Sequence, residues 1–264
     1  MRIARFTTGS DPMFGIIQDK DGVDTVYGLT GDPLYTEIQP SGVIVPLEDV
    51  RLLAPVIPRS KVVGVGKNYA DHAAEMGTEV PEIPLLFLKP NTTVIGPGDP
   101  IITPEFTDEL SLEAELAVVI KRVAKNVTAA DAADYIFGYT CANDLTARDA
   151  QRAENQWFRA KAFDTSCPLG PWIETDLDLD SGLRVTSHVD GEIQQDGTTA
   201  DMLWSLPALI EEITKVTTLL PGDVILTGTP AGVSLVTPGQ SIDVTIDGIG
   251  TLTNRVLRAD DLQA

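Results

Sequence analysis

The stretch from Leu112 to Ile120 is apolar except for two acids, Glu113 and Glu115. Side chains alternate between the two faces of a β-strand, so both acids should share a face with Ala117 and Val119. Neither face is then polar enough for solvent, and burial of neighbouring carboxylates is unfavourable unless a cation joins them. The pattern predicts a buried strand with two ligands for a divalent metal ion, or else an edge strand with its acids in solvent.

Short β-like segments separated by turns fill the N-terminal part of the chain. Asp21-Gly22 between two apolar runs is typical of a β-hairpin turn. Pro55 and Pro58 disfavour regular structure around them, which indicates a linker. We therefore predict a small N-terminal β domain over residues 1–57 and a larger domain over residues 58–264.

The rest of the chain alternates short strands with a few helices. Apolar runs between glycine, proline or lysine positions predict strands at 61–66, 85–88, 112–120 and 135–141. Cap signals predict short helices at 68–76 (closed by Gly77), 128–135 (capped by Thr128) and 145–156. From Pro221 onward, β-runs between turns predict an all-β tail. This order does not repeat a βαβ unit, so the predicted fold class is β-rich α+β.

Composition and charge narrow the function classes. The 264 residues include 19 Lys and Arg against 39 Asp and Glu, a net charge of −20 that disfavours nucleic acid and anionic membranes as partners. An anionic substrate would need a local cationic trap. The chain shows neither a signal peptide nor an apolar run of membrane-spanning length, and it has only two cysteines, Cys141 and Cys167. We expect a cytoplasmic protein with reduced thiols.

His72 and Glu75 lie three residues apart in the predicted helix 68–76, and therefore on one face of it. A carboxylate beside an imidazole orients the ring and raises its basicity, which suits a base that activates water. The same spacing also occurs in exposed helical pairs of no consequence. The chain has only two histidines, and the second, His188, lies in an apparent hairpin arm. His72 is therefore the better candidate for a base.

Asp144 stands where a predicted strand gives way to the predicted helix 145–156. Aspartate is a favoured helix N-cap, but side chains at strand ends also converge on sites, so a cap and a third metal carboxylate are both open. Arg148 and Gln151 follow at i+4 and i+7, on the same side of that helix. They are candidates for binding substrate, although Arg148 could instead pair with the acids.

Three further residues could act beside such a centre. Lys161 could neutralise carboxylates and stabilise a developing oxyanion, and Lys89 could do the same with less support from its surroundings. Thr229 belongs to a glycine turn at 227–232 whose hydroxyls and N–H groups could hold a carboxylate. Each also has an ordinary explanation: a solvated lysine in the first two cases and a tight β-corner in the third.

Some familiar patterns are incomplete. Gly64 and Gly66 follow a strand and precede a helix, but the third glycine of a dinucleotide fingerprint is missing, as are the spacing and hydroxyl of a P-loop. Neither cysteine lies in a Cys–His nucleophile pattern or close to another zinc-type ligand. A nicotinamide enzyme, a cysteine enzyme and a structural zinc site are therefore disfavoured.

Six motifs, in order along residues 58–255, resemble the fumarylacetoacetate hydrolase family, and within it the branch of 2-hydroxyhepta-2,4-diene-1,7-dioate isomerases, acylpyruvases and oxaloacetate decarboxylases. The motifs are Gly-Lys-Asn-Tyr-Ala-Asp-His at 66–72, Phe-Leu-Lys-Pro at 87–90, Glu-Ala-Glu-Leu-Ala-Val-Val-Ile at 113–120, Asn-Asp-Leu-Thr-Ala-Arg-Asp-Ala-Gln at 143–151, Lys-Ala-Phe-Asp-Thr-Ser-Cys-Pro-Leu-Gly-Pro at 161–171 and Leu-Thr-Gly-Thr-Pro-Ala-Gly-Val at 226–233. Each motif is unspecific alone, and their order and spacing carry the resemblance.

The resemblance implies a mixed β-sandwich roll with a Mg²⁺ or Mn²⁺ site, usually in a homodimer. By matching motifs, it makes Glu113, Glu115 and Asp144 the metal ligands. It makes His72 and Glu75 a water-activating dyad on a mobile lid. The N-terminal segment matches the small N-terminal domain of some members only loosely.

Other positions match polar residues around the substrate and the metal. Thr229 matches a substrate contact, and Thr165 matches a threonine near the metal in some members. Ala162 stands where many relatives have glycine, a departure that concerns the local backbone and not the metal. We therefore predict Lys161 as a catalytic residue, and substrate binding by Arg148, Gln151, Thr229 and Lys89.

One chemistry connects the reactions that this resemblance implies. A 2-oxo acid can chelate the ion through a carboxylate and its 2-oxo oxygen, and the ion acts as a Lewis acid that stabilises an enolate. Hydrolysis of an acylpyruvate, decarboxylation of oxaloacetate and isomerisation of a hydroxymuconate-type dienol all use this step. We predict such an enzyme, acting on a small anionic 2-oxo acid in aromatic or amino acid catabolism. The alternative is a non-catalytic acidic β protein that binds Ca²⁺ or a partner.

Overall fold

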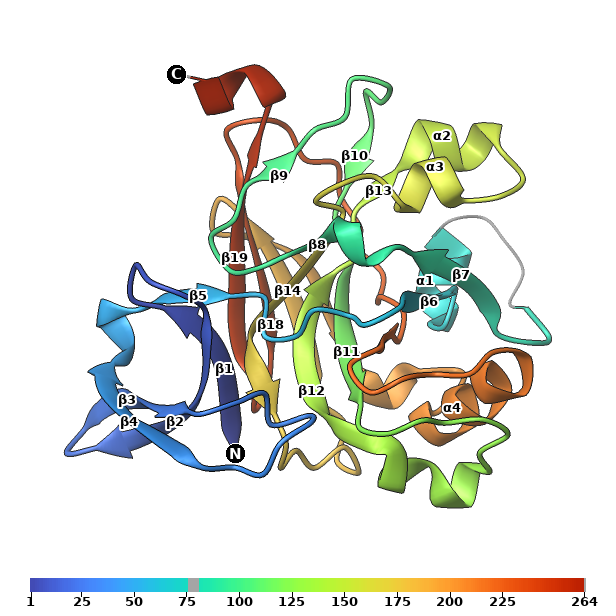
Figure 1. Ribbon diagram of the computed structural model, residues 1–264. Coiled ribbons are helices and arrows are strands. Elements are labelled where there is room, and N and C mark those ends of the chain that lie inside the picture. The colour runs from blue at the N-terminus through green and yellow to red at the C-terminus, as the bar shows by residue number, and fades with distance from the viewer. Residues whose placement is uncertain (76–80, 264) are drawn as a thin grey trace.

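Strands build most of the molecule (Figure 1). The structure, a computed structural model, describes residues 1–75 and 81–263, apart from the side chains at 73, 262 and 263. The largest sheet contains β1 (Arg2–Thr7), β2 (Met13–Lys20), β3 (Val23–Leu29), β4 (Pro40–Pro46), β5 (Arg51–Leu53), β6 (Val62–Gly66), β7 (Leu85–Lys89), β8 (Val94–Ile95), β11 (Ala114–Ile120), β12 (Ile136–Asn143), β14 (Cys167–Glu174) and β17 (Val224–Leu226). Its main order is β4-β3-β2-β1-β14-β12-β11-β17-β6-β7, with β5 paired to β1 and β8 to β14.

A second sheet covers one face of the first. It contains β9 (Ile101–Ile102), β15 (Arg184–Val189), β16 (Glu192–Thr198), β18 (Ser241–Ile246) and β19 (Gly250–Leu257), in the order β16-β15-β18-β19-β9. Leu116 and Cys141 of the large sheet pack in one core with Val185, Val244 and Leu252 of this second sheet. Pairing is mostly antiparallel but parallel between β17 and β6, β14 and β8, and β19 and β9. The predicted β-rich fold with mixed sheets is confirmed.

The helices are short. The α-helices are α1 (Ala70–Glu75), α2 (Arg148–Ala153), α3 (Phe158–Lys161) and α4 (Leu206–Val216), and the 3₁₀-helices are η1 (Leu47–Asp49), η2 (Asn91–Thr93), η3 (Ala129–Tyr135), η4 (Thr199–Asp201) and η5 (Ala259–Gln263). Over the described residues, none of these helices has the length and apolarity that crossing a bilayer requires.

Strand β11 behaves as its alternation predicts. Leu116 faces the second sheet, and Val118, on the same side, packs against helix α4. Ala117 and Val119 point the other way, into a core with Val62 and Leu169. Every residue of the strand is buried, so an edge strand with solvated acids is excluded.

Helix α4 was not predicted, although its signal is present in the sequence. Leu206, Leu209, Ile210 and Ile213 follow the i, i+3, i+4, i+7 spacing of an amphipathic helix, and all four are buried. Ser205 occupies the N-cap position directly before them. The helix packs against Val63 of β6, Val118 of β11 and Ile225 of β17.

Three predicted helices differ from the structure. Residues 145–156 form a helix only over α2, because Thr146–Ala147 instead makes strand β13, which pairs with β10 (Leu110–Ser111). Residues 128–135 form a 3₁₀-helix, and the Thr128 hydroxyl donates to the Asp131 side chain and does not cap a backbone N–H. The predicted helix 68–76 is α1, which begins at Ala70 and not at Asn68, and its expected end at Met76 and Gly77 lies outside the described residues.

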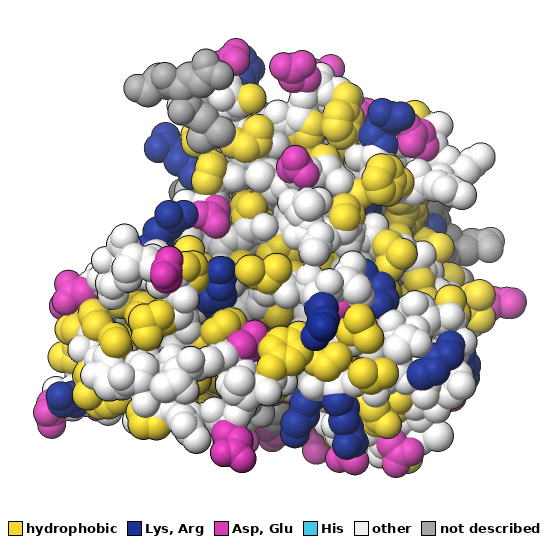
Figure 2. Space-filling model, viewed as in Figure 1, with side chains coloured by type: hydrophobic (Ala, Val, Ile, Leu, Met, Phe, Trp, Pro, Cys, Tyr) yellow, Lys and Arg dark blue, Asp and Glu magenta, His cyan; other side chains and the backbone are white. Residues whose placement is uncertain are grey.

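The N-terminal strands form the hairpin predicted at Asp21-Gly22, between β2 and β3. They are not separate from the rest of the sheet. Strand β1 pairs with β14, with Ile3 opposite Ile173, so backbone hydrogen bonds connect the N-terminal segment to the main sheet. The domain boundary near Pro58 stays a prediction. On the face shown in Figure 2, acidic and basic side chains are interspersed and form no patch of one sign.

Candidate active site

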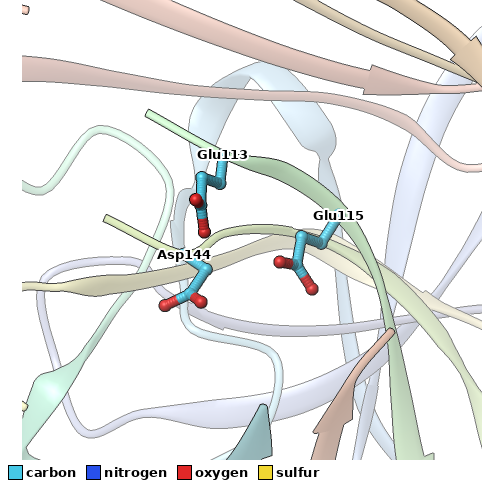
Figure 3. Close-up of side chains that lie close together, drawn as sticks. All are labelled: Glu113, Glu115 and Asp144. Carbon is cyan, nitrogen blue, oxygen red and sulfur yellow. The ribbon is translucent and has the colours of Figure 1, made fainter. Parts of the chain in front are cut away.

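Three acidic side chains meet at one end of the neighbouring strands β11 and β12. Glu115 belongs to β11, Glu113 precedes it, and Asp144 directly follows β12. The backbone N–H of Asp144 donates to the carbonyl of Glu113 at 2.9 Å, which sets the two residues opposite each other. One carboxylate oxygen from each residue lies within 4.8 Å of the others, and all three residues are buried. The three carboxyl groups converge on one region (Figure 3).

Three buried cations surround these acids. The ammonium of Lys161 lies 2.6 Å from both Glu113 and Asp144, and that of Lys89 lies 2.6 Å from the other oxygen of Asp144. The guanidinium of Arg148 donates to Glu113 at 2.5 Å. Glu115 has no cation of its own in the described part of the chain: its only hydrogen bond comes from the N–H of Gly228, at 2.6 Å.

This unequal pairing shifts the pKa values in opposite directions. Burial raises the pKa of Glu115 well above its ordinary value, and the charges of Asp144 and Glu113 raise it further. Burial would also raise the pKa of Glu113, but Arg148 and Lys161 outweigh it and lower that pKa. Glu115 is therefore the acid whose charge the protein alone does not balance.

The predicted dyad lies over the same site. His72, on α1, is buried, and its Nδ1 lies 3.4 Å from a carboxylate oxygen of Glu75. Glu75 also accepts the N–H of Gly232 at 3.1 Å. Burial lowers the pKa of His72, although the charge of Glu113 opposes that effect, so the imidazole is held neutral at neutral pH. A neutral ring with its Nδ1 engaged by Glu75 leaves Nε2 for a proton transfer.

A cavity of about 240 Å³ connects these groups. Its apolar wall comes from Val65, Phe87 and Trp157, and two glycines of β6 make room for it. A Cβ at Gly64 would lie 2.2 Å from the Phe87 ring, and one at Gly66 would lie 2.8 Å from the Trp157 ring. The glycines that gave an incomplete dinucleotide pattern therefore serve close packing.

Most predicted site residues line this cavity, namely His72, Glu113, Glu115, Asp144, Arg148, Gln151, Lys161 and Thr229. Glu75 and Lys89 do not line it. Among the described residues, Glu75 contacts the cavity only through His72, and Lys89 is a counter-charge behind Asp144, so the geometry gives no support to its predicted substrate contact. Thr165 also lies elsewhere, and its hydroxyl accepts the N–H of Ile102 at 2.9 Å. Asp144 is not a helix N-cap, since that position at α2 belongs to Ala147.

One buried residue of the site was missed in the sequence. Gln195, on β16 of the second sheet, accepts the N–H of Ala114, which lies between the two glutamates, at 2.9 Å. Its amide nitrogen donates to the hydroxyl of Thr229 at 2.7 Å and to the carbonyl of Pro230 at 2.8 Å. Gln195 thus joins the acidic strand to the turn that carries the N–H groups of Gly228 and Gly232. Gln195 is completely buried and its neighbour Gln194 is not, but nothing in the sequence indicates which of the two glutamines is buried.

The donor set fits a divalent metal ion. Three convergent carboxylates are the ligands that Mg²⁺ and Mn²⁺ favour, and no thiol or imidazole belongs to the group. A dication beside Glu115 would balance the one acid without a cationic partner. The buried hydroxyl of Tyr69, whose pKa is raised by burial and by Glu115, also lacks a hydrogen-bond partner among the described residues. Glu113, Glu115 and Asp144 are therefore the residues that could hold the ion.

Comparison with known proteins identifies the family. The profile for the fumarylacetoacetate (FAA) hydrolase C-terminal region matches residues 61–257, and the profile for the Rv2993c-like N-terminal region matches residues 1–55. The chain therefore belongs to the fumarylacetoacetate hydrolase family, as its motifs indicated.

Individual relatives agree with this assignment. Protein Rv2993c of Mycobacterium tuberculosis is 54% identical over 215 residues, which are 81% of this chain and 81% of that protein. Oxaloacetate tautomerase YisK of Bacillus subtilis is 44% identical over 223 residues, 80% of this chain and 74% of that protein. The solved structure of 5-carboxymethyl-2-hydroxymuconate delta-isomerase from Mycobacterium smegmatis has a TM-score of 0.90 and 46% identity, covering 98% of this chain and 100% of that chain.

Proposed function

We propose that the protein is a Mg²⁺- or Mn²⁺-dependent enzyme that moves a proton on small enolisable 2-oxo acids, and that keto–enol tautomerisation or isomerisation is its main reaction. The observation that carries this proposal is a buried histidine, in contact with Glu75, in the same cavity as three convergent carboxylates. A similar protein is named an oxaloacetate tautomerase and a similar structure a hydroxymuconate isomerase, and both reactions consist of proton transfers.

The residues of the chain have distinct parts in this proposal. His72 takes the proton from the carbon next to the 2-oxo group through Nε2 and returns it to another atom of the same substrate. Glu75 holds the ring through Nδ1 and keeps it in the required tautomer. Lys161, buried between Glu113 and Asp144, supplies positive charge where the 2-oxo oxygen becomes negative.

We assign binding of the 2-oxo acid substrate to polar residues of the cavity wall. Arg148 already donates to Glu113 and, through Nη1, to the carbonyl oxygen of the Gln151 side chain at 2.9 Å. This leaves the amide nitrogen of Gln151 for a substrate oxygen. The Thr229 hydroxyl donates to the carbonyl of Ala114 at 2.8 Å and accepts from the Gln195 amide at 2.7 Å, so it has no hydrogen left to donate to a carboxylate of the substrate. A divalent ion at the three carboxylates would supply Lewis-acid charge toward the carboxylate and 2-oxo groups of the substrate.

Hydrolysis of acylpyruvates is the second candidate, because the contact between His72 and Glu75 also suits a base that activates water. Decarboxylation of oxaloacetate is the third candidate, from the resemblance of the motifs, and the homodimer predicted from the motifs stays a prediction.

A Mg²⁺-supplemented panel of oxaloacetate, acylpyruvates and hydroxymuconate-type dienols separates these reactions. Loss or gain of enol absorbance without pyruvate release supports tautomerisation or isomerisation. Pyruvate released from an acylpyruvate supports hydrolysis, and carbon dioxide released from oxaloacetate supports decarboxylation. Metal-dependent thermal stabilisation without turnover of any member of the panel would contradict the enzyme proposal and favour a non-catalytic metal-binding protein.

A further inference from the structure

Four cationic side chains line the cavity, and three of them are already paired. Lys161 and Arg148 contact the buried acids, and Arg152 donates to both carboxylate oxygens of Glu109, at 2.8 and 2.7 Å. The fourth, Lys67, makes no side-chain hydrogen bond and no ion pair with any described residue, although it lines the same cavity. Its positive charge is therefore available to a ligand.

The backbone holds Lys67 in an unusual conformation. Its φ of 58° lies in the left-handed region, where a non-glycine residue is strained. Residues strained in this way cluster at functional sites. A glycine would adopt this φ without strain, so the turn itself does not account for a lysine there.

The neighbouring residue fixes this turn. The buried side chain of Asn68 donates to the carbonyl of Thr227 at 2.7 Å and accepts the N–H of Trp204 at 2.8 Å. The carbonyl of Asn68 accepts the N–H of Leu203 at 2.8 Å. These contacts hold the backbone from which the Lys67 side chain enters the cavity.

Lys67 is more exposed than the acids of the cavity. Glu113, Glu115 and Asp144 are buried, whereas Lys67, like Gln151 and Trp157, is partly exposed. A substrate whose first carboxylate and 2-oxo group face the acids would extend its remaining chain toward this rim. Lys161, Lys89 and Arg148 contact Glu113 and Asp144, whereas Lys67 contacts no acid among the described residues, so its positive charge is not used by the buried acids.

From this geometry we infer that Lys67 binds a second carboxylate of the substrate, so that the enzyme prefers dicarboxylic 2-oxo acids to monocarboxylic ones. This inference rests on the proposed function and narrows its substrate class. The ammonium would donate a charge-assisted hydrogen bond to the distal carboxylate, an interaction that a neutral ester of the same shape cannot match.

The test compares oxaloacetate with its 4-methyl ester, which keeps the 2-oxo acid and removes the distal charge. We expect Lys67→Met to lower kcat/KM for tautomerisation of oxaloacetate about tenfold, mainly through KM, and to leave the ester unchanged. Lys67→Arg should recover most of the loss. Lys20→Met, which removes the same charge at an exposed position outside the cavity, should leave both substrates unaffected.

An equal loss on both substrates, or no loss on either, would overturn the assignment of Lys67. If the wild-type protein converts neither substrate, the proposed function fails, and binding then decides the inference separately. 2-Oxoglutarate has no cleavable 1,3-dicarbonyl group and stays intact during calorimetry with Mg²⁺. Lys67→Met should weaken its binding about tenfold while leaving its 5-methyl ester unchanged, and equal binding by both proteins would contradict the inference.

Discussion

The parallel strands β6 and β17 carry a cluster of buried charge at each end. At the start of both strands, Asp223 accepts hydrogen bonds from five donor groups, including the Lys61 ammonium at 2.7 Å and the Ser60 hydroxyl at 2.8 Å. At the far end, beyond both strands, lie Glu115 and its acidic neighbours, within reach of the cavity.

The two clusters differ in how completely the protein satisfies them. Burial would raise the pKa of Asp223, but Lys61, the N–H of Leu220 and Ser60 outweigh it, so the pKa is lowered. Burial and the charges of Asp144 and Glu113 raise the pKa of Glu115, and one backbone N–H, its only hydrogen bond from the described residues, does not offset them. The first cluster is complete and stabilises the fold. The second is incomplete without a ligand, which is the arrangement expected of a site that binds a cation.

The largest expected effect is at the incomplete cluster. Glu115→Gln should lower the Mg²⁺-dependent rate about 10³-fold, because the variant loses a charged ligand at the reacting centre. Its stability without metal should not fall, since the substitution removes an unbalanced buried charge. Steady-state rates and chemical denaturation in a chelator measure the two quantities. A variant that keeps its rate would remove Glu115 from the site.

The opposite result is expected at the complete cluster. Asp223→Asn should lower the free energy of unfolding by about 3 kcal/mol, because it leaves Lys61 without its partner. Metal affinity should not change. Denaturant titration measures the loss, and Asp196→Asn is the matched control, because its pair with Arg184 is exposed and should have no measurable effect on stability. Equal losses in the two variants would show that the contrast between the clusters is wrong.

A smaller effect is expected from the residue that connects the acidic strand to the turn. Gln195→Met keeps the size of the side chain but loses the hydrogen bonds to Ala114, Thr229 and Pro230. We expect about tenfold weaker Mn²⁺ binding, as for other residues that orient metal ligands. Calorimetry checks this. Gln194→Met is the control, and the same affinity in both variants would make Gln195 merely structural.

The pH dependence of stability gives the smallest effect. A carboxyl group with a lowered pKa in the folded state stabilises the fold above its ordinary pKa, which is 3.8 for aspartate here, and loses that contribution as the pH falls through the folded value. The difference in unfolding free energy between wild type and Asp223→Asn should therefore be constant near neutral pH and shrink below pH 3.8. If the difference in unfolding free energy persisted in strong acid, the loss of stability would come from altered packing and not from the charge of Asp223.

The sequence predicted those features that depend on local pattern. The alternation around Glu113 and Glu115 correctly gave the two faces of β11. For Asp144 the strand end left a helix cap and a metal carboxylate both open, and the structure excludes the cap. Helix 145–156 was wrong in its first residues, because pairing of Thr146–Ala147 with β10 depends on a segment far away in the chain. The position of Lys89 behind Asp144 was not predicted for the same reason, because the two residues are far apart in the sequence.

Contacts between backbone and distant side chains were the least predictable. Gln195 acts on Ala114 and Thr229, which lie 81 and 34 residues away, and nothing in its own surroundings in the sequence indicates these partners. Likewise, the lack of a partner for Lys67 among the described residues becomes visible only when the partners of Arg152 and Lys161 are known. Motif resemblance identified the family and the acids, while the accessory residues required coordinates.

Calorimetric titration of metal-free protein with Mn²⁺ tests most directly whether the three acids form a metal site. The geometry predicts one binding site per chain in the wild type and its loss in Glu115→Gln, with Asp223→Asn binding as tightly as the wild type. Binding of equal strength by Glu115→Gln, or no binding by the wild-type protein, would contradict the account.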